Sequence, residues 1–303
     1  MKIVIPGGTG FIGAKLVLAA QTRGDEVVVV SRKQTAPIAK ERVVVWDAHT
    51  APADAEWVRA VDGADAVINL AGASVADEPW TPSRLRVLEE SRTESTRAVV
   101  EALALAKQKP KVLVNASAIG YYGSHPTGEV TFDESSAPGP GVLGDMCVAW
   151  EEAAKSARGV RVALARIGIV LGDGGALAAM TTPYKAFVGG PIGSGKQVLS
   201  WIHGDDCVRA LLFAVDHEEL TGPFNACAPE PATMDEFAKA LGRALHRPAV
   251  FRAPAFVVRL AMGARATIVL DGQRVVPKRL LAAGFTFEHP SLLGALQHVT
   301  SAP

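Results

Sequence analysis

The sequence predicts an α/β protein built on a doubly wound parallel sheet, with a smaller and mostly helical C-terminal cap. Through the first half of the chain, short apolar segments rich in β-branched residues alternate with segments of helical periodicity. Strands buried on both faces have that apolar composition, and their alternation with helices is typical of parallel sheets. In the second half glycine and proline become frequent and the alternation stops, which indicates a region of different structure.

The expected strands are the apolar runs of the first half. They span Ile3–Ile5, Val27–Val30, Val43–Trp46, Ala66–Leu70, Val112–Val114 and Val160–Ile169. Between them, apolar residues recur three and four positions apart, as they do on one face of a helix. These helices are expected at Phe11–Thr22, Ala53–Val61, Pro82–Gln108 and Leu143–Ala157.

The second half predicts an irregular stretch followed by further helices. No strand alternation persists over Leu171–Gln197, whereas helical patterns cover Asp205–Leu220, Met234–His246 and Pro290–Val299. We expect residues 1–170 to form the sheet domain, residues 201–228 to return to it, and residues 171–200 and 229–303 to form the cap. The ligand cleft then lies between the two, beyond the carboxyl ends of the strands.

Charge and composition exclude several classes of partner. Of the 303 residues, 49% are hydrophobic, and 31 basic residues balance 31 acidic ones. A balanced charge argues against a nucleic-acid or membrane surface held by electrostatics. The stretch "MKIVIPGG" is too short for the apolar core of a signal peptide, and no run approaches 18 apolar residues, so no transmembrane helix is expected.

Cysteine usage favours a reducing compartment. Cys147, Cys207 and Cys227 are odd in number, widely spaced and without a CxxC motif. They predict neither a disulfide framework nor a zinc site. We therefore expect a cytoplasmic protein without a metal centre.

The strongest motif follows the first expected strand. In "GGTGFIG", Gly7, Gly10 and Gly13 stand between strand and helix, where they permit a tight turn, close approach to a pyrophosphate and close helix packing. The N–H groups of the helix N-terminus then face the phosphates. This pattern indicates a Rossmann-type dinucleotide-binding domain over residues 1–170; a merely structural glycine turn is the alternative.

The end of the second strand indicates which dinucleotide binds. An unphosphorylated ribose calls for Asp or Glu there, whereas this chain has "VVSRK", with Ser31, Arg32 and Lys33. A hydroxyl and a guanidinium suit a 2′-phosphate. The motif favours NADP(H) over NAD(H), against the alternative of a solvated basic loop.

Three further features bear on the dinucleotide site. "NLAG", from Asn69 to Gly72, ends the fourth strand with small residues that let the backbone approach a ribose. Asp47 either caps a turn or accepts from the adenine amine. Arg92 lies on the inward stripe of the long helix, where a charge needs a partner. That partner is either a protein carboxylate or a cofactor phosphate.

The chain as a whole resembles an extended short-chain dehydrogenase/reductase. More narrowly, it is similar to the atypical epimerase-like proteins labelled as sugar-nucleotide epimerases or by the cell-division inhibitor name SulA. The resemblance is carried by "GGTGFIG" (7–13), "VSRK" (30–33), "NLAG" (69–72), "SR" (91–92), "WEEAA" (150–154), "RIGIVLG" (166–172), "GGPIGSGKQVLSWIH" (189–203) and "DGQRVVPKRLLAAGFTFEHP" (271–290).

The resemblance implies an NADP(H) site and leaves the substrate unnamed. The implied cofactor residues are Gly7, Gly10, Phe11, Ile12, Gly13, Ser31, Arg32, Leu70, Ala71, Gly72 and Arg92.

Catalysis in that superfamily uses a Ser or Thr, a Tyr, and a Lys four residues after the Tyr. Here "NASAIGYYG" offers Ser117, Tyr121 and Tyr122 as candidates, although the usual serine position falls on Ala118. By the family spacing, the Tyr and Lys positions fall on Leu143 and Cys147, so the usual pair is missing. Cys147 is expected to be a packed thiol, with a nucleophile as the alternative.

Other motifs favour structural interpretations. "GPIGSGK" has phosphate-loop spacing, but Gln197 stands where a Mg²⁺-binding hydroxyl is required; a substrate-side loop is expected. His203 with Asp205 and Asp206 is expected to cap a helix rather than to bind metal, because no third ligand accompanies it. His125 and Glu134 are weak candidates for substrate contacts.

Two functions remain open. The first is an NADP(H)-dependent oxidoreductase or epimerase acting on a small carbonyl or hydroxyl compound or a sugar nucleotide, with Tyr121, Tyr122, Ser117 or water replacing the missing pair. The second is a catalytically weak NADP(H)-binding sensor or regulatory module. The cap motif at 189–203 favours the enzyme. The sequence also leaves the oligomeric state open, including a homo-oligomer.

Overall fold

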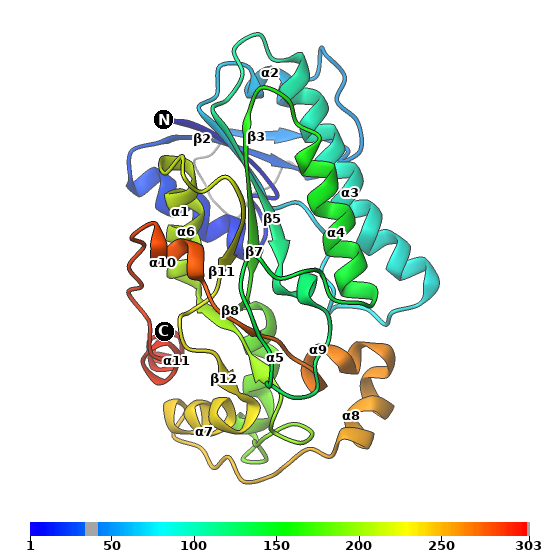
Figure 1. Cartoon of the computed structure of the whole chain (residues 1–303), viewed down its shortest axis with the longest axis vertical. Coiled ribbons are helices and arrows are strands. Elements are labelled where there is room, and N and C mark those ends of the chain that lie inside the picture. Colours follow the sequence, from blue (N-terminus) through cyan, green and yellow to red (C-terminus); the bar gives the residue numbers. More distant parts are fainter. Residues whose placement is uncertain (34–41, 302–303) are drawn as a thin grey trace.

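The central element of the computed structural model is a parallel sheet of seven strands in the order β11-β7-β5-β4-β1-β2-β3 (Figure 1). The structure describes residues 1–33 and 42–301. The strands are β1 (Lys2–Pro6), β2 (Glu26–Ser31), β3 (Arg42–Val45), β4 (Ala66–Asn69), β5 (Val112–Ala118), β7 (Arg161–Ile167) and β11 (Gly222–Ala226). The order reverses between β1 and β4, and this switch point is where doubly wound sheets bind ligands. The predicted fold class is confirmed.

Helices cover both faces of the sheet because successive strand residues point to opposite sides. Ile3 and Ile5 pack in one core with α1 (Phe11–Thr22) and α6 (Gly204–Asp216). Val4 packs in the other. That second core includes residues of α2 (Glu56–Val61), α3 (Pro82–Leu105) and α4 (Val142–Lys155). Figure 1 shows α1 and α6 on the side of the sheet opposite to α3 and α4.

The remaining elements are short and build a smaller, mostly helical region. Its helices are α5 (Gly175–Lys185), α7 (Met234–Ala244), α8 (Ala255–Met262), α9 (Thr267–Leu270) and α11 (Leu292–Ser301), with the 3₁₀ helices η1 (Ile119–Tyr122) and η2 (Gly263–Ala266). Helix α10 (Lys278–Ala282) packs against the main sheet instead, because its Leu280 belongs to the core that contains α1 and α6. Three strand pairs accompany them: β8 (Ile169–Leu171) with β10 (Trp201–His203), β9 (Val198–Leu199) with β12 (Ala232–Thr233), and β6 (Thr131–Phe132) with β13 (Arg274–Val275). Leu177, Trp201, Phe237 and Leu296 share a separate core there.

Two expectations for individual elements were wrong. The apolar run Val160–Ile169 is not one strand: β7 ends at Ile167, and Ile169 donates its N–H to the carbonyl of Ser200 instead. The chain can turn away at Gly168, where a Cβ would lie 2.6 Å from the Ser200 oxygen. The stretch expected to be irregular contains α5, which begins after Gly174 and runs through alanine and leucine, residues of high helix propensity.

No helix within the described residues is both long enough and apolar enough to cross a membrane.

A buried ion pair joins α4 to the sheet. Glu151 on α4 and Arg166 on β7 form a two-fold contact, with Nε to Oε1 at 2.8 Å and Nη2 to Oε2 at 2.9 Å. Both side chains are almost fully buried. Ser117 on β5 donates to the same carboxylate at 2.8 Å, and Arg166 donates to the hydroxyl of Tyr122 on η1 at 3.0 Å. Four elements therefore meet around one pair of charges.

We expect Glu151→Gln to lower the free energy of unfolding by about 3–5 kcal/mol, because it leaves the Arg166 charge buried without its counterion. Urea denaturation measures this loss. The matched control is Glu152→Gln, which removes an exposed pair with Lys155 and is expected to cost no more than about 1 kcal/mol. Equal losses in the two variants would contradict the role assigned to the buried pair.

Candidate functional site

A polar cavity of about 210 Å³ opens at the carboxyl ends of β1, β2 and β4. Most of the predicted cofactor residues line it. They are Gly7, Gly10, Ser31, Arg32, Leu70, Ala71 and Gly72. The sequence motifs of three separate strands thus come together in one place, at the switch point of the sheet.

The glycines of the first motif are required by the close approach of backbone segments. Gly7 has φ +80°, and a Cβ there would lie 2.7 Å from the carbonyl carbon of Leu70. A Cβ at Gly13 would collide with the Gly7 oxygen. Gly10 caps α1 without a side-chain hydrogen bond. The N–H groups of Phe11 and Ile12 in the first helical turn are therefore left for an anion.

The wall of the polar cavity beside β2 carries a cation and hydroxyl groups. Ser31 and Arg32 line it, and the Ser31 hydroxyl lies 3.3 Å from that of Thr9. Over the described part of the chain, no carboxylate lines this cavity. Asp47 caps a turn: it accepts from the Thr50 hydroxyl and from the N–H of His49. These contacts, the hydroxyl first, lower the pKa of Asp47 to about 2.

Arg92 stands where the polar cavity meets a second, apolar one. It lines the apolar cavity, while its neighbour Ser91 lines the polar one. Its guanidinium donates to the carbonyls of Leu88 and Ala73, at 2.8 and 2.9 Å, and lies 5.2 Å from the Trp150 ring centroid. Within the described ranges it forms no ion pair, so the buried protein carboxylate offered as its alternative partner is not found. Burial lowers the pKa of Arg92, as expected of a desolvated cation.

The apolar cavity has a volume of about 230 Å³ and lies between the sheet, α4 and the C-terminal region. Its walls are mostly aliphatic or aromatic, with few groups able to form hydrogen bonds. The lining includes Ile119, Leu143, Met146, Cys147, Trp150, Ile167, Ile169, Val198, Leu199, Ile268 and, as polar members, Arg92, Ser124, Ser200, Asp271 and Gln273.

Leu143 and Cys147 of α4 both line this cavity. They sit over Gly120, where a Cβ would lie 3.2 Å from the Leu143 Cβ and 3.7 Å from the Cys147 sulfur. Burial, with Glu151 nearby, raises the pKa of Cys147 to about 11. A thiol held in its neutral form is a poor nucleophile, so the structure favours the packed thiol that the sequence indicated.

The three predicted catalytic residues lie outside both cavities. Ser117 and Tyr122 are buried in the network around Glu151, where Tyr122 also donates to Asn225 at 2.7 Å. Burial raises the pKa of Tyr122 to about 12, which disfavours proton release near neutrality. The ring of Tyr121 lies 3.4 Å from the Arg166 guanidinium carbon. Their positions favour structural roles for Ser117 and Tyr122 and give no support to a catalytic one.

Asp271 is a titratable group of the apolar cavity that the sequence did not single out as a site residue. Its carboxyl is half-buried, and burial raises its pKa, with Arg259 and His125 partly opposing the shift. A carboxyl group in such surroundings can hold a proton that a solvated one would lose. Its place as the first residue of the motif at 271–290 is the signal that could have identified it.

The other residues that the sequence singled out hold structural positions. In the loop of "GPIGSGK", Ile192 pairs with Ala253, and the apolar cavity is lined instead by residues 198–200 that follow the loop. Glu134 accepts from the N–H groups of Asn225 and Arg279. The stretch from His203 to Asp206 begins a helix, α6, as expected, but its cap is His203, which accepts from the N–H of Asp205, and the two aspartates lie in the first turn.

Comparison with known proteins places the chain in one family. Residues 3–227 match the model of the NAD dependent epimerase/dehydratase family, and residues 253–299 match a domain of unknown function, DUF1731. An epimerase family protein of Staphylococcus haemolyticus is 39% identical over 99% of both chains. The chloroplastic epimerase family protein SDR39U1 homolog of Arabidopsis thaliana is 38% identical over 99% of this chain and 86% of its own length.

A solved structure agrees with this placement. The human epimerase family protein SDR39U1 (isoform 2), crystallised with NADPH, superposes with a TM-score of 0.89 at 34% identity and 99% coverage of both chains. The chain therefore belongs to the NAD-dependent epimerase/dehydratase family of extended short-chain dehydrogenase/reductases, the group whose members bind NAD(P).

Proposed function

We propose that the protein is an NADP(H)-dependent oxidoreductase that acts on a small, weakly polar carbonyl or hydroxyl compound. The observation that carries this proposal is the meeting of two unlike cavities at one edge of the sheet. The polar cavity has the glycine turn and the cationic wall of a dinucleotide site, whereas the apolar one has Asp271. Ser91 and Arg92 are consecutive on α3: Ser91 lines the polar cavity, and Arg92 lines the apolar one.

The residues of the polar cavity fit an NADP(H) molecule. The α1 N-terminus suits the pyrophosphate, and Ser31 with Arg32 suits a 2′-phosphate. Among the described residues, this wall lacks the carboxylate that accepts the ribose hydroxyls in NAD(H) sites, which favours NADP(H). The NADPH in the human relative supports the same choice.

The apolar cavity favours a small substrate over a sugar nucleotide. A nucleoside diphosphate brings two negative charges and needs several cationic donors. Across the described residues, Arg92 is the lone cation in the lining, and backbone carbonyls already accept from two of its five N–H donors. Aliphatic walls favour the binding of a substrate with apolar surface instead.

Proton transfer is assigned to Asp271. The bound nicotinamide would supply or accept a hydride, and the substrate oxygen would gain or lose a proton. The positions that carry Tyr and Lys in the superfamily hold Leu143 and Cys147 here, so neither usual group is available. Asp271 lines the apolar cavity, and burial raises its pKa, which favours the proton-donating form that reduction of a carbonyl requires.

One observation favours a second function. Leu143 and Cys147 give the cavity wall no proton donor near neutral pH, as in an NADP(H)-binding sensor that has kept its cofactor site and lost catalysis. Such a module would bind NADPH without turnover of any carbonyl substrate.

Replacing Arg32 by alanine is expected to weaken NADPH binding at least 10-fold and to leave NADH binding nearly unchanged, because only NADPH carries the 2′-phosphate. Fluorescence titration of the tag-free protein with both cofactors measures the ratio. Lys33→Ala is the matched control, since Lys33 lies outside the cavity lining. A wild-type preference for NADH that Arg32→Ala does not alter would refute the cofactor assignment.

Asp271→Asn is expected to lower kcat for carbonyl reduction at least 100-fold while NADPH binding stays the same, because the amide cannot donate the proton. In the wild type, kcat should fall as pH rises through the raised pKa of Asp271, since the reaction needs the protonated carboxyl. The residual activity of the variant should lack this pH dependence. Stopped-flow NADPH oxidation over a panel of small ketones and aldehydes provides the rates.

Tyr121→Phe and Tyr122→Phe distinguish the alternatives. Both variants are expected to keep wild-type kcat, because neither side chain reaches the cavity. If Tyr121→Phe lost activity while Asp271→Asn kept the wild-type kcat, the result would support Tyr121 and not Asp271 as the catalytic residue. Tight NADPH binding without turnover of any compound in the panel would favour the sensor.

A further inference from the structure

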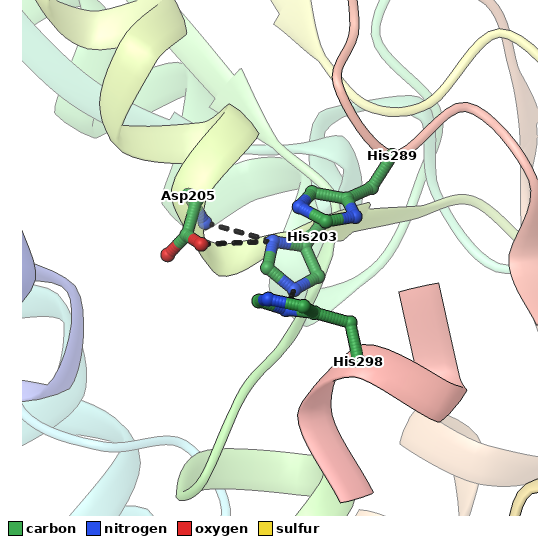
Figure 2. A group of neighbouring side chains, drawn as sticks. All are labelled: His203, Asp205, His289 and His298. Carbon is green, nitrogen blue, oxygen red and sulfur yellow. Dashed lines mark hydrogen bonds and ion pairs between the residues drawn. The ribbon is translucent and has the colours of Figure 1, made fainter. Parts of the chain in front are cut away.

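Three histidines from distant parts of the chain converge beside the N-terminus of α6 (Figure 2). His203 ends β10 and caps α6, His289 precedes α11, and His298 lies on α11. Asp205 in the first turn of α6 joins them. One donor atom from each of the four residues lies within 4.8 Å of the others. His289 and His298 could not be associated with His203 from the sequence, because 86 and 95 residues separate them from it.

The nitrogen atoms of this histidine cluster are close enough to share a ligand. Nε2 of His203 lies 3.0 Å from Nδ1 of His298, and the rings of His203 and His289 stack with centroids 3.8 Å apart. Two imidazoles bound to one zinc ion at about 2.0–2.1 Å hold their nitrogens about 3.3 Å apart in tetrahedral geometry. The His203–His298 pair is therefore within a few tenths of an ångström of the spacing of two ligands.

His203 has a hydrogen-bonding partner at each ring nitrogen. Nδ1 accepts from the N–H of Asp205 at 3.1 Å, and Nε2 forms a hydrogen bond with Nδ1 of His298 at 3.0 Å. Imidazole binds metal through a nitrogen lone pair. A metal ion that enters between His203 and His298 therefore replaces the hydrogen bond between these two nitrogens.

We propose that His203, His289 and His298 bind a divalent transition-metal ion, with Zn²⁺ as the ion that best matches three imidazole donors. Imidazole suits zinc, copper and nickel, whereas Mg²⁺ and Ca²⁺ prefer oxygen. This site lies apart from both cavities of the proposed function, and the proposal departs from the expectation of a protein without a metal centre.

Asp205 has the position of a partner that orients His203. Its Oδ2 lies 3.7 Å from Nδ1 of His203, on the side of the ring opposite to His298 (Figure 2). In the present arrangement Nδ1 accepts from the N–H of Asp205. When Nε2 binds metal, Nδ1 has to carry the proton, so this cap bond is given up. Nδ1 can then donate to the carboxylate of Asp205, an arrangement common around zinc. The other oxygen of Asp205 lies 3.9 Å from the ammonium of Lys15.

The backbone that carries His289 is already fixed. The buried carboxylate of Asp206 accepts from the N–H groups of Glu288 and His289, at 2.9 and 2.8 Å. Metal binding therefore requires the stacked ring of His289 to turn about its side-chain bonds without movement of the chain. His289 is half-buried and His298 is exposed, so both rings have room to turn.

A metal ion here would tie the last helix to the sheet domain. His298 lies on α11, while His203 and Asp205 belong to β10 and α6. An ion that binds only the folded chain stabilises it in proportion to the logarithm of its concentration. We expect the bound metal to be structural, with α11 as the element that it holds in place.

Calorimetric titration of the tag-free, metal-stripped protein with ZnSO₄ tests the site. We expect one ion per chain with a dissociation constant in the micromolar range or below, and no response to MgSO₄ at the same concentrations. His298→Ala and His289→Ala should each weaken zinc binding at least 10-fold. Asp205→Asn should weaken it by about 10-fold, the lower range for an orienting partner.

The matched control is His246→Asn, which removes an exposed histidine of the C-terminal region whose φ of +53° asparagine tolerates. It should bind zinc as the wild type does. The thermal unfolding midpoint should rise with zinc concentration in the wild type and in His246→Asn, and stay constant in His298→Ala. Absence of a saturable one-to-one site, or equal losses in His298→Ala and His246→Asn, would overturn the proposal.

Discussion

The buried ion pair between Glu151 and Arg166 is the interaction on which the walls of the apolar cavity depend. Two charges removed from water are tolerated only when their hydrogen-bonding groups are satisfied, and here Ser117 and Tyr122 supply part of that satisfaction. The pair thus fixes α4 against β5, β7 and η1 at one point. With α4 fixed, its side chains reach the cavity wall at defined positions.

The sheet could be predicted from the sequence because its determinants are local. Buried parallel strands are short β-branched runs, and the glycine turn stands beside its own strand and helix. The end of β7 shows where local patterns stop. Ile167 and Ile169 look alike in the sequence, yet Ile169 pairs with Trp201 of β10, and only the three-dimensional path of residues 198–203 decides this.

The same distinction between local sequence patterns and long-range contacts applies to the candidate site. The residues of "GGTGFIG" and "VVSRK" line one cavity because each motif stands directly at the end of its own strand. The surroundings of Ser117 and Tyr122 could not be predicted, because sequence register cannot show that Glu151 and Arg166 take up their polar atoms. Asp271 and the histidine cluster depend on how the C-terminal region folds back on the sheet.

The role proposed for Asp271 depends on the pKa from which each type of acid starts. Burial raises the pKa of every acid that is neutral when protonated, and its effect depends on the starting value. A tyrosine begins near 10 and moves further from neutrality, so it needs a nearby cation such as lysine to be useful. A carboxyl group begins near 4 and moves toward neutrality without help. A cavity with Leu143 and Cys147 at the usual Tyr and Lys positions is therefore unsuited to a tyrosine and suited to Asp271.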